Sequence, residues 1–171
     1  MVSIKKNIVL IGMPSSGKST IGVGLAAILD RNFIDTDSII QQTEKMDLKD
    51  IVNKRGLETF LKIQEFNILN LEAKDSVIAT GGSVIYSNNS MYHLKKDGVV
   101  VYLKLEINEL MKRTEPGRRF ARNKEQNYTD LYKERLPLYD KYSDITVDCS
   151  GKDVDQIIRE IISRYCSYTE A

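Results

Sequence analysis

One nine-residue segment constrains this chain more than any other: Gly12-Met-Pro-Ser-Ser-Gly-Lys-Ser-Thr20. It matches the pattern G-x-x-x-x-G-K-[ST], a loop between a strand and a helix that curls around phosphate groups. The surrounding sequence agrees, because the apolar run Asn7–Ile11 precedes the loop and a helix-like pattern over residues 17–29 follows it. The alternative is a glycine turn that binds nothing. The strand–loop–helix context favours a phosphate-binding loop around which the fold is built.

The residues of this loop predict how phosphates would be bound. Its glycines let successive backbone N–H groups point at phosphate oxygens, and the following helix adds a partial positive charge at its N-terminus. Lys18 would bridge the β- and γ-phosphates of a nucleotide, and the hydroxyl of Ser19 would ligate Mg²⁺. The candidate nucleotide-binding residues of the loop are Gly12, Pro14, Ser15, Ser16, Gly17, Lys18, Ser19 and Thr20.

The rest of the chain alternates strand-like and helix-like segments. Apolar runs predict strands over 7–11, 33–35, 76–80, 98–103 and 144–147. Helical spacing predicts helices over 17–29, 48–53, 60–71, 108–113, 130–142 and 154–165. Pro137 should bend or end the helix that contains it. About five strands alternating with helices imply an α/β fold, a parallel sheet with helices on both faces.

Asp35 and Asp37 lie just beyond the second predicted strand. Carboxylates at the carboxyl end of a strand face the ligand crevice of an open α/β sheet. If the strand's alternation continues, both side chains point to the same side. One could support Mg²⁺ through water, and the other could accept a hydroxyl proton. The alternative for Asp37 is a structural role as the N-cap of a helix.

Composition sets the remaining limits. The 171 residues fit one domain, and 25 Lys and Arg against 24 Asp and Glu give a net charge of +1. A general polyanion binder needs a basic surplus, so we expect no nucleic-acid partner. Apolar runs are too short for a membrane span or a signal peptide, and Cys149 and Cys166 show no disulfide or metal spacing. We expect a cytoplasmic protein that is a monomer or weak dimer. Residues 114–127 are polar and contain Pro116, Gly117 and three arginines, which predicts a mobile surface loop.

Taken together, these motifs resemble the shikimate kinase family of small-molecule kinases. The resemblance runs roughly from residue 7 to 162 and includes the phosphate loop, Phe33-Ile-Asp-Thr-Asp37, residues 56–65, Val77-Ile-Ala-Thr-Gly-Gly82, Val100-Val-Tyr-Leu103 and Arg135-Leu-Pro-Leu-Tyr139. It implies a P-loop kinase architecture like that of nucleoside monophosphate kinases, a lid over ATP at about residues 114–127, and transfer of the γ-phosphate to a hydroxyl of shikimate.

The same resemblance implies roles around the reacting groups. Asp37 would bind the acceptor hydroxyl and act as base or orienting group, and Asp35 would help place Mg²⁺. Either Arg118 or Arg119 would be the lid arginine that reaches the transferring phosphoryl group. Arg113 would lie near the adenine. Positive charge at the lid suits phosphoryl transfer, although a solvated charged loop is the alternative for such arginines.

The resemblance also implies residues for the acceptor, a small hydroxylated and anionic molecule. The backbones of Gly81 and Gly82 would approach its ring closely, and Arg135 would pair with its carboxylate. The alternative for Arg135 is an ion pair with Glu134 or Asp140.

Three departures from the family pattern fall in the acceptor site and the lid. The family's G-E-x-x-F-R-x-x-E has Leu61 where an arginine binds the acceptor carboxylate, and its G-G-G ends here in Ser83. Leucine cannot form the two-pronged contact of arginine with a carboxylate. Lys62 is adjacent but about 100° away around a helix. In the lid, R-P-L becomes Arg118-Arg119-Phe-Ala, so either arginine could serve.

These departures leave three functions open. The chain could be a shikimate kinase in which Arg135 holds the carboxylate alone or with a reoriented Lys62. It could instead phosphorylate a different small anionic hydroxylated metabolite, with Leu61 and Ser83 marking the changed pocket. It could also bind nucleotide without phosphoryl transfer, although the retention of Lys18 and both aspartates argues against this.

Overall fold

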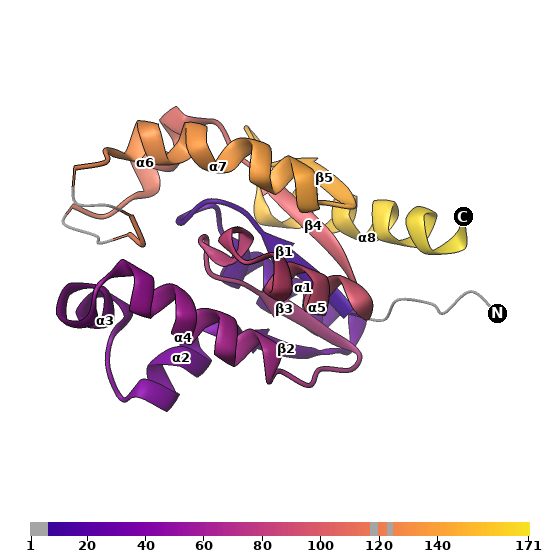
Figure 1. Cartoon of the computed structure of the whole chain (residues 1–171). Helices are drawn as coiled ribbons and strands as arrows, with labels where there is room; N and C mark the ends of the chain where they lie inside the picture. Colours follow the sequence, from indigo (N-terminus) through magenta and orange to yellow (C-terminus); the bar gives the residue numbers. More distant parts are fainter. Residues whose placement is uncertain (1–6, 117–119, 123–124) are drawn as a thin grey trace.

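A computed structural model describes residues 7–116, 120–122 and 125–171 (Figure 1). Five strands form one sheet in the order β2-β3-β1-β4-β5, and each neighbouring pair runs parallel. The strands are β1 (Asn7–Ile11), β2 (Asn32–Asp35), β3 (Ser76–Ala79), β4 (Gly98–Lys104) and β5 (Ile145–Asp148). The parallel five-stranded sheet predicted from the sequence is confirmed.

The middle of the sheet is buried on both faces. Every residue of β1 and β3 is buried, and so is all of β4 up to its last residue. Val9 of β1 pairs with Ile78 of β3 on one side and Val100 of β4 on the other. Strands covered on both faces need apolar side chains at successive positions, which is why these segments read as continuous apolar runs.

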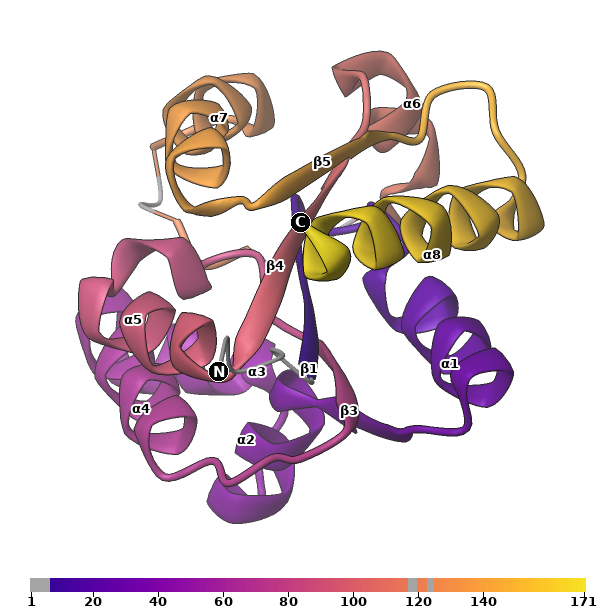
Figure 2. The ribbon, with the colours of Figure 1, turned by 90° about the vertical axis from the view of Figure 1, so that its right-hand side faces the viewer.

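Helices cover both faces of the sheet, as Figure 2 shows. On one face lie α1 (Lys18–Leu29) and α8 (Val154–Glu170). On the other lie α4 (Leu57–Leu69), α5 (Asn88–Lys96) and α7 (Tyr128–Tyr142). A capping box fixes the start of α8, where Asp153 and Gln156 bond to each other's backbone N–H groups.

A second, smaller hydrophobic core lies beyond the carboxyl end of the sheet. It joins α2 (Thr36–Glu44), α3 (Leu48–Arg55) and α4 through the buried side chains Ile40, Ile51, Val52 and Phe60. Figure 1 shows these three helices together on one side of the molecule. The elements not yet named are α6 (Ile107–Arg113) and the short 3₁₀ helix η1 (Val84–Tyr86).

The start of α2 corrects one expectation. Helix α2 begins at Thr36, directly after β2, so Asp37 lies in the first turn of a helix and not on an extended strand. The alternation argument for Asp35 and Asp37 was therefore wrong. The N-cap expectation was wrong too, since Asp35 rather than Asp37 caps α2, with its Oδ1 accepting from the backbone N–H groups of Asp37 and Ser38.

Pro137 does not end α7, which continues to Tyr142. Proline lacks an N–H, so the helix loses one internal hydrogen bond at this point. The buried side chains Leu131, Arg135 and Tyr139 flank the proline along one face of α7 and hold both of its halves against the molecule.

The strand order places the phosphate loop at a change of direction in the chain. From β1 the chain goes to β2 and β3 on one side, and then crosses to β4 and β5 on the other. Ligands bind beyond the carboxyl ends of strands at such a point. Within the ranges that the structure describes, no helix is both long enough and apolar enough to cross a membrane.

Candidate active site

A cavity of about 280 Å³ lies beyond the carboxyl ends of β1, β2 and β3. Side chains from α3, α4 and α7 and from residues 120–121 complete its walls. Twelve of the residues predicted from the sequence line it: Pro14, Ser15, Gly17, Lys18, Ser19, Thr20, Asp35, Asp37, Gly81, Gly82, Ser83 and Arg135. Gly12, Ser16, Leu61 and Arg113 do not line it, and Arg118 and Arg119 lie outside the described residues.

The phosphate loop has the backbone shape that anion binding requires. Ser15 and Gly17 both adopt left-handed conformations, with φ of 69° and 92°, before α1 begins at Lys18. Turns of this kind bring successive N–H groups to one side of the chain. The N-terminus of α1 adds its dipole at the same place. The loop can therefore bind phosphate groups through its backbone.

Lys18 is held in place by the loop itself. Its Nζ donates to the carbonyl oxygens of Gly12 at 2.8 Å and Met13 at 2.7 Å, and its side chain is almost fully buried. Gly12 and Ser16, which lie behind the cavity wall, take part in this arrangement, because Lys18 Nζ is also 3.4 Å from Ser16 Oγ. The charge of Lys18 is thus in position beside the loop without any ligand.

Ser19 and Asp35 form a pair of oxygen ligands beside the loop. Ser19 Oγ donates to Asp35 Oδ2 at 2.8 Å, while Asp35 Oδ1 caps α2. Mg²⁺ at nucleotide sites takes only one or two protein oxygens and completes its shell with water and phosphates. Within the described ranges, no group of three or more His, Cys, Asp or Glu could hold a metal ion. A serine hydroxyl and one carboxylate oxygen match the small number of protein ligands that Mg²⁺ takes at nucleotide sites.

Two consecutive glycines form the floor between Asp37 and Arg135. A Cβ atom on Gly81 would lie 2.5 Å from Asp37 Oδ1. A Cβ atom on Gly82 would lie 2.8 Å from Pro14 Cδ and 2.9 Å from Arg135 Nη1. Any side chain here would collide with its neighbours. The bare backbone is what allows the carboxylate and the guanidinium to border the same small space.

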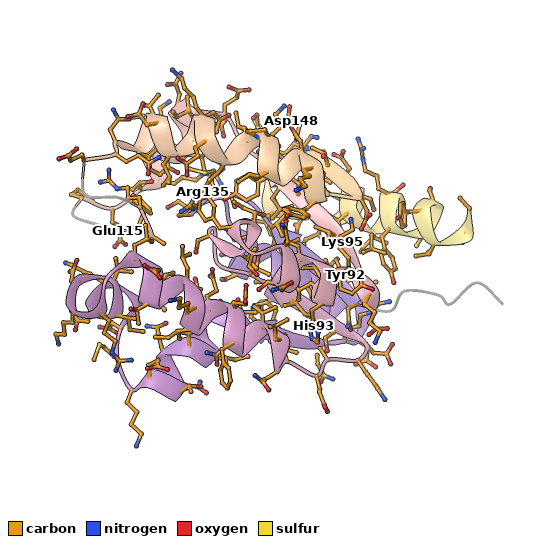
Figure 3. The ribbon with its side chains drawn as sticks, viewed as in Figure 1. Tyr92, His93, Lys95, Glu115, Arg135 and Asp148 are labelled. Carbon is orange, nitrogen blue, oxygen red and sulfur yellow. The ribbon has the colours of Figure 1, made fainter. Side chains whose placement is uncertain are left out.

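Arg135 is a buried cation that lines this space. It is 1% exposed, its Nε donates to Tyr86 Oη at 3.2 Å, and its Nη2 donates to the carbonyl of Ala121 at 2.7 Å. Figure 3 shows Arg135 on the side of α7 that faces the rest of the molecule. Within the described residues it forms no ion pair with Glu134 or Asp140, so that alternative is wrong.

Leu61 lies outside the cavity wall and packs onto the second core of α2, α3 and α4. Lys62 is exposed and pairs with Glu58 at 2.8 Å, one turn earlier on α4. The structure therefore does not bring Lys62 into the cavity.

Ser83 makes a contact that the sequence did not predict. Its hydroxyl donates to Gln64 Oε1 at 3.0 Å, and both residues are buried. Gln64 Nε2 lies 2.8 Å from the Cβ position of Gly81, on the same face as Asp37. A signal was available, since the last residue of G-E-x-x-F-R-x-x-E falls on Gln64. The departures at positions 64 and 83 thus form one hydrogen-bonded pair.

Phe120 and Ala121, from the segment predicted to be a lid, line the cavity. Phe120 packs on the ring of Tyr128, with 5.1 Å between ring centroids, and Tyr128 Oη donates to the carbonyl of Pro14 at 3.1 Å. Arg113 ion-pairs with Glu109 at 3.7 Å, and its Nη1 lies 4.0 Å from the Cβ position of Gly17, behind the phosphate loop.

Comparison with known proteins decides the family. The model of the family described as shikimate kinase matches residues 14–166. The chain belongs to the shikimate kinase family. A shikimate kinase of Caldanaerobacter subterraneus is 33% identical over 165 residues, which cover 94% of this chain and 96% of the relative.

Solved structures agree with this assignment. A shikimate kinase from Acinetobacter baumannii, in complex with shikimate, superposes with a TM-score of 0.87 at 28% identity, covering 96% of this chain and 95% of that one. A thymidylate kinase from Candida albicans, at 16% identity and a TM-score of 0.59, covers 96% of this chain and 93% of its own and shares the fold. Like other shikimate kinase family members, the chain is a small-molecule kinase that transfers phosphate to a hydroxyl.

Proposed function

We propose that this chain transfers the γ-phosphate of ATP to a hydroxyl of shikimate, producing shikimate 3-phosphate and ADP in aromatic amino acid biosynthesis. The observation that carries the proposal is the buried Arg135 in the wall of the same cavity that the phosphate loop lines. An anionic acceptor held by Arg135 would have its hydroxyl beside Asp37. The structural relative from Acinetobacter baumannii, which was solved with shikimate, supports the same acceptor.

The proposed donor side is the phosphate loop. Its backbone N–H groups and Lys18 hold the phosphates of ATP, and Lys18 exchanges contacts with Gly12 and Met13 for phosphate oxygens. Ser19 and Asp35 would hold Mg²⁺, which neutralises charge on the β- and γ-phosphates when bound. Arg113 would lie near the adenine.

The proposed acceptor side is built on Asp37. Its carboxylate orients the acceptor hydroxyl and accepts its proton as that oxygen attacks the γ-phosphorus. Residues 114–127 form a lid whose closure over ATP excludes water, which would otherwise accept the phosphoryl group. Arg118 or Arg119 then reaches the transferring group.

A second acceptor is favoured by one specific observation. Leu61 stands where the family pattern has an arginine, so Arg135 is the cation that remains for the acceptor anion. A different small anionic hydroxylated metabolite would use the same donor side. Ser83 argues less strongly for this alternative, because its hydroxyl is bonded to Gln64 and does not need a ligand.

The deciding experiment is coupled ADP release with Mg²⁺-ATP. Shikimate is assayed beside small hydroxy acids, hydroxy amino acids, sugar acids and polyols. We expect saturable turnover on shikimate with a KM below about 1 mM. Turnover on another acceptor with none on shikimate would overturn the proposed substrate. ATP binding with no ADP from any acceptor would favour a nucleotide-binding protein.

We also propose that residues 1–171 act as one domain in the cytoplasm, as a monomer or weak dimer. The formal charge of +1 supports the absence of a nucleic-acid partner. Sedimentation velocity of the purified chain tests the oligomeric state.

A further inference from the structure

Arg135 carries its charge among neutral partners. Its guanidinium donates to the hydroxyl of Tyr86 and to the carbonyl of Ala121, and the hydroxyl of Tyr139 is a further polar neighbour. The Tyr86 ring also lies against the guanidinium, with its centroid 5.2 Å from Cζ. Within the described ranges Arg135 has no carboxylate within ion-pair distance. A buried cation held in this way is ready for an anion that arrives with the substrate.

The two hydrogen bonds occupy one particular edge of the guanidinium. A guanidinium offers five N–H donors, and two of its edges present a pair of N–H groups to a carboxylate. The Nε–Nη2 edge is used by Tyr86 and Ala121. Neither of these two groups uses the edge formed by Nη1 and the second N–H of Nη2, and Nη1 lies 2.9 Å from the Cβ position of Gly82, which lines the cavity.

Tyr86 also links Arg135 to a carboxylate, that of Glu134. Its hydroxyl accepts from Arg135 Nε and donates to Glu134 Oε1, while Glu134 Oε2 accepts from Gln126 Nε2 at 2.8 Å. Burial raises the pKa of the Tyr86 phenol, so the hydroxyl stays protonated at neutral pH. Glu134 thus supports the charge of Arg135 through the phenol without touching the guanidinium.

We propose that Tyr86 is a positioning residue that turns the Nη1–Nη2 edge of Arg135 toward the carboxylate of the acceptor and keeps Glu134 from competing with it. The inference rests on the proposed function for the identity of that acceptor. It explains how one arginine can suffice where the family pattern has two, because the single guanidinium is fixed before the substrate binds. Pre-organisation of this kind improves affinity by lowering the cost of ordering.

Tyr86→Phe tests the role of the hydroxyl while keeping the ring. We expect the KM for shikimate to rise about tenfold, with kcat and the KM for ATP within about twofold of wild type. Tyr92→Phe is the matched control, since Tyr92 on α5 is 77% exposed (Figure 3) and should leave all three constants unchanged. An unchanged KM for shikimate in Tyr86→Phe would overturn the inference, and so would equal losses in kcat and in the affinities for both substrates.

A second measurement needs no turnover. In ¹⁵N spectra, Arg135 Nε–H is identified by its loss in Arg135→Lys. We expect this proton to be protected from solvent exchange in wild type and to lose about tenfold or more of that protection in Tyr86→Phe. Shikimate should slow the exchange of the Nη protons and leave Nε–H in place. Displacement of Nε–H by shikimate would contradict the assigned edge.

The two measurements separate this inference from the proposed function. If wild type does not phosphorylate shikimate but Tyr86→Phe loses the protection of Nε–H, the substrate is wrong and the positioning role is supported. If wild type phosphorylates shikimate and Tyr86→Phe matches it in both measurements, the substrate stands and the positioning role is wrong.

Discussion

The polar side chains around the cavity are held by atoms of the same chain. Lys18 is bonded to Gly12 and Met13, and Ser19 is bonded to Asp35. Each contact keeps a charged or hydroxyl group at the place where a ligand would need it. Substrate binding then exchanges one set of hydrogen bonds for another, and little side-chain freedom is lost at that step.

Removing the charge of Lys18 should stop phosphoryl transfer without unfolding the protein. We expect Lys18→Ala to lower kcat by about 100-fold or more, because a donor aimed at the transferring phosphate is lost. The far-ultraviolet circular dichroism should be unchanged. The exposed Lys49→Ala is the control in the coupled ADP assay. Wild-type turnover in Lys18→Ala would contradict the role of Lys18.

Asp37→Asn keeps the shape of the side chain and removes its ability to accept a proton. We expect kcat to fall by about 100-fold or more, with the KM for ATP little changed, since the carboxylate acts on the acceptor hydroxyl. Asp50→Asn on α3, half-buried and paired with Lys54 at 3.8 Å, is the matched control. Normal turnover in Asp37→Asn would remove Asp37 from the mechanism.

Among the secondary-structure elements, the junction of β2 and α2 contains one carboxylate that both caps a helix and belongs to the candidate active site. Asp35 ends β2, caps α2 through Oδ1 and accepts from Ser19 through Oδ2. The cap fixes the start of α2 at Thr36, and Asp37 is positioned because it lies in the first turn of this helix. A change in Asp35 therefore affects both the stability of α2 and the geometry of the site.

Two substitutions of Asp35 separate these effects. Asparagine caps helices as well as aspartate does, whereas alanine does not. We expect Asp35→Ala to lower the free energy of unfolding by about 1 kcal/mol and Asp35→Asn to lower it by less. Both should raise the Mg²⁺ concentration needed for half-maximal activity. Urea unfolding measures the free energy of unfolding, and titration of Mg²⁺ in the ADP assay measures the Mg²⁺ requirement. An unchanged Mg²⁺ requirement in both variants would argue against Asp35 as a ligand.

Helix α4 carries the residue that departs most from the family pattern. We expect Leu61→Arg to lower the KM for shikimate by about tenfold, through a second guanidinium for the carboxylate. Leu61 packs on the second core, so some loss of thermal stability should accompany the change. The exposed Lys62→Arg is the control. An unchanged or higher KM would mean that the pocket has been rebuilt around another acceptor.

Elements with strong local signals could be predicted from the sequence, and those that depend on distant contacts could not. The strand and helix that flank the phosphate loop were predicted within a residue, because the loop pattern and the apolar runs agree. Helices α2 and α5 were missed, since each buries few apolar side chains. The contact of Arg135 with Tyr86 joins residues 49 positions apart, and no local pattern encodes it.

At the scale of the whole molecule, the main core encloses one of the two thiols. Cys149 follows β5 and is fully buried, whereas Cys166 on α8 is exposed. Burial raises the pKa of the Cys149 thiol to about 12, so almost none of it is thiolate at neutral pH. Its reaction with a reagent in water requires the core to open.

Thiol labelling should therefore report global unfolding. We expect Ellman's reagent at pH 8 to modify one thiol per native chain and two in denaturant. In Cys166→Ser, only the buried Cys149 remains, so its thiol should react no faster than the core opens. ATP binds the folded state and should slow this reaction further. Fast modification of native Cys166→Ser would show that the core around β5 opens locally.

The lack of side chains at Gly81 and Gly82 also affects which substitutions can change the acceptor specificity of such a pocket during evolution. A side chain at either position would come within 3 Å of side-chain atoms of Asp37 and Gln64 or of Pro14 and Arg135, so a substitution there would displace groups that border the cavity. Substitutions at the residues around the glycines leave those groups in place, and Leu61, Gln64 and Ser83 already differ from the family pattern. Relatives with a different acceptor should therefore differ at those flanking positions and keep both glycines.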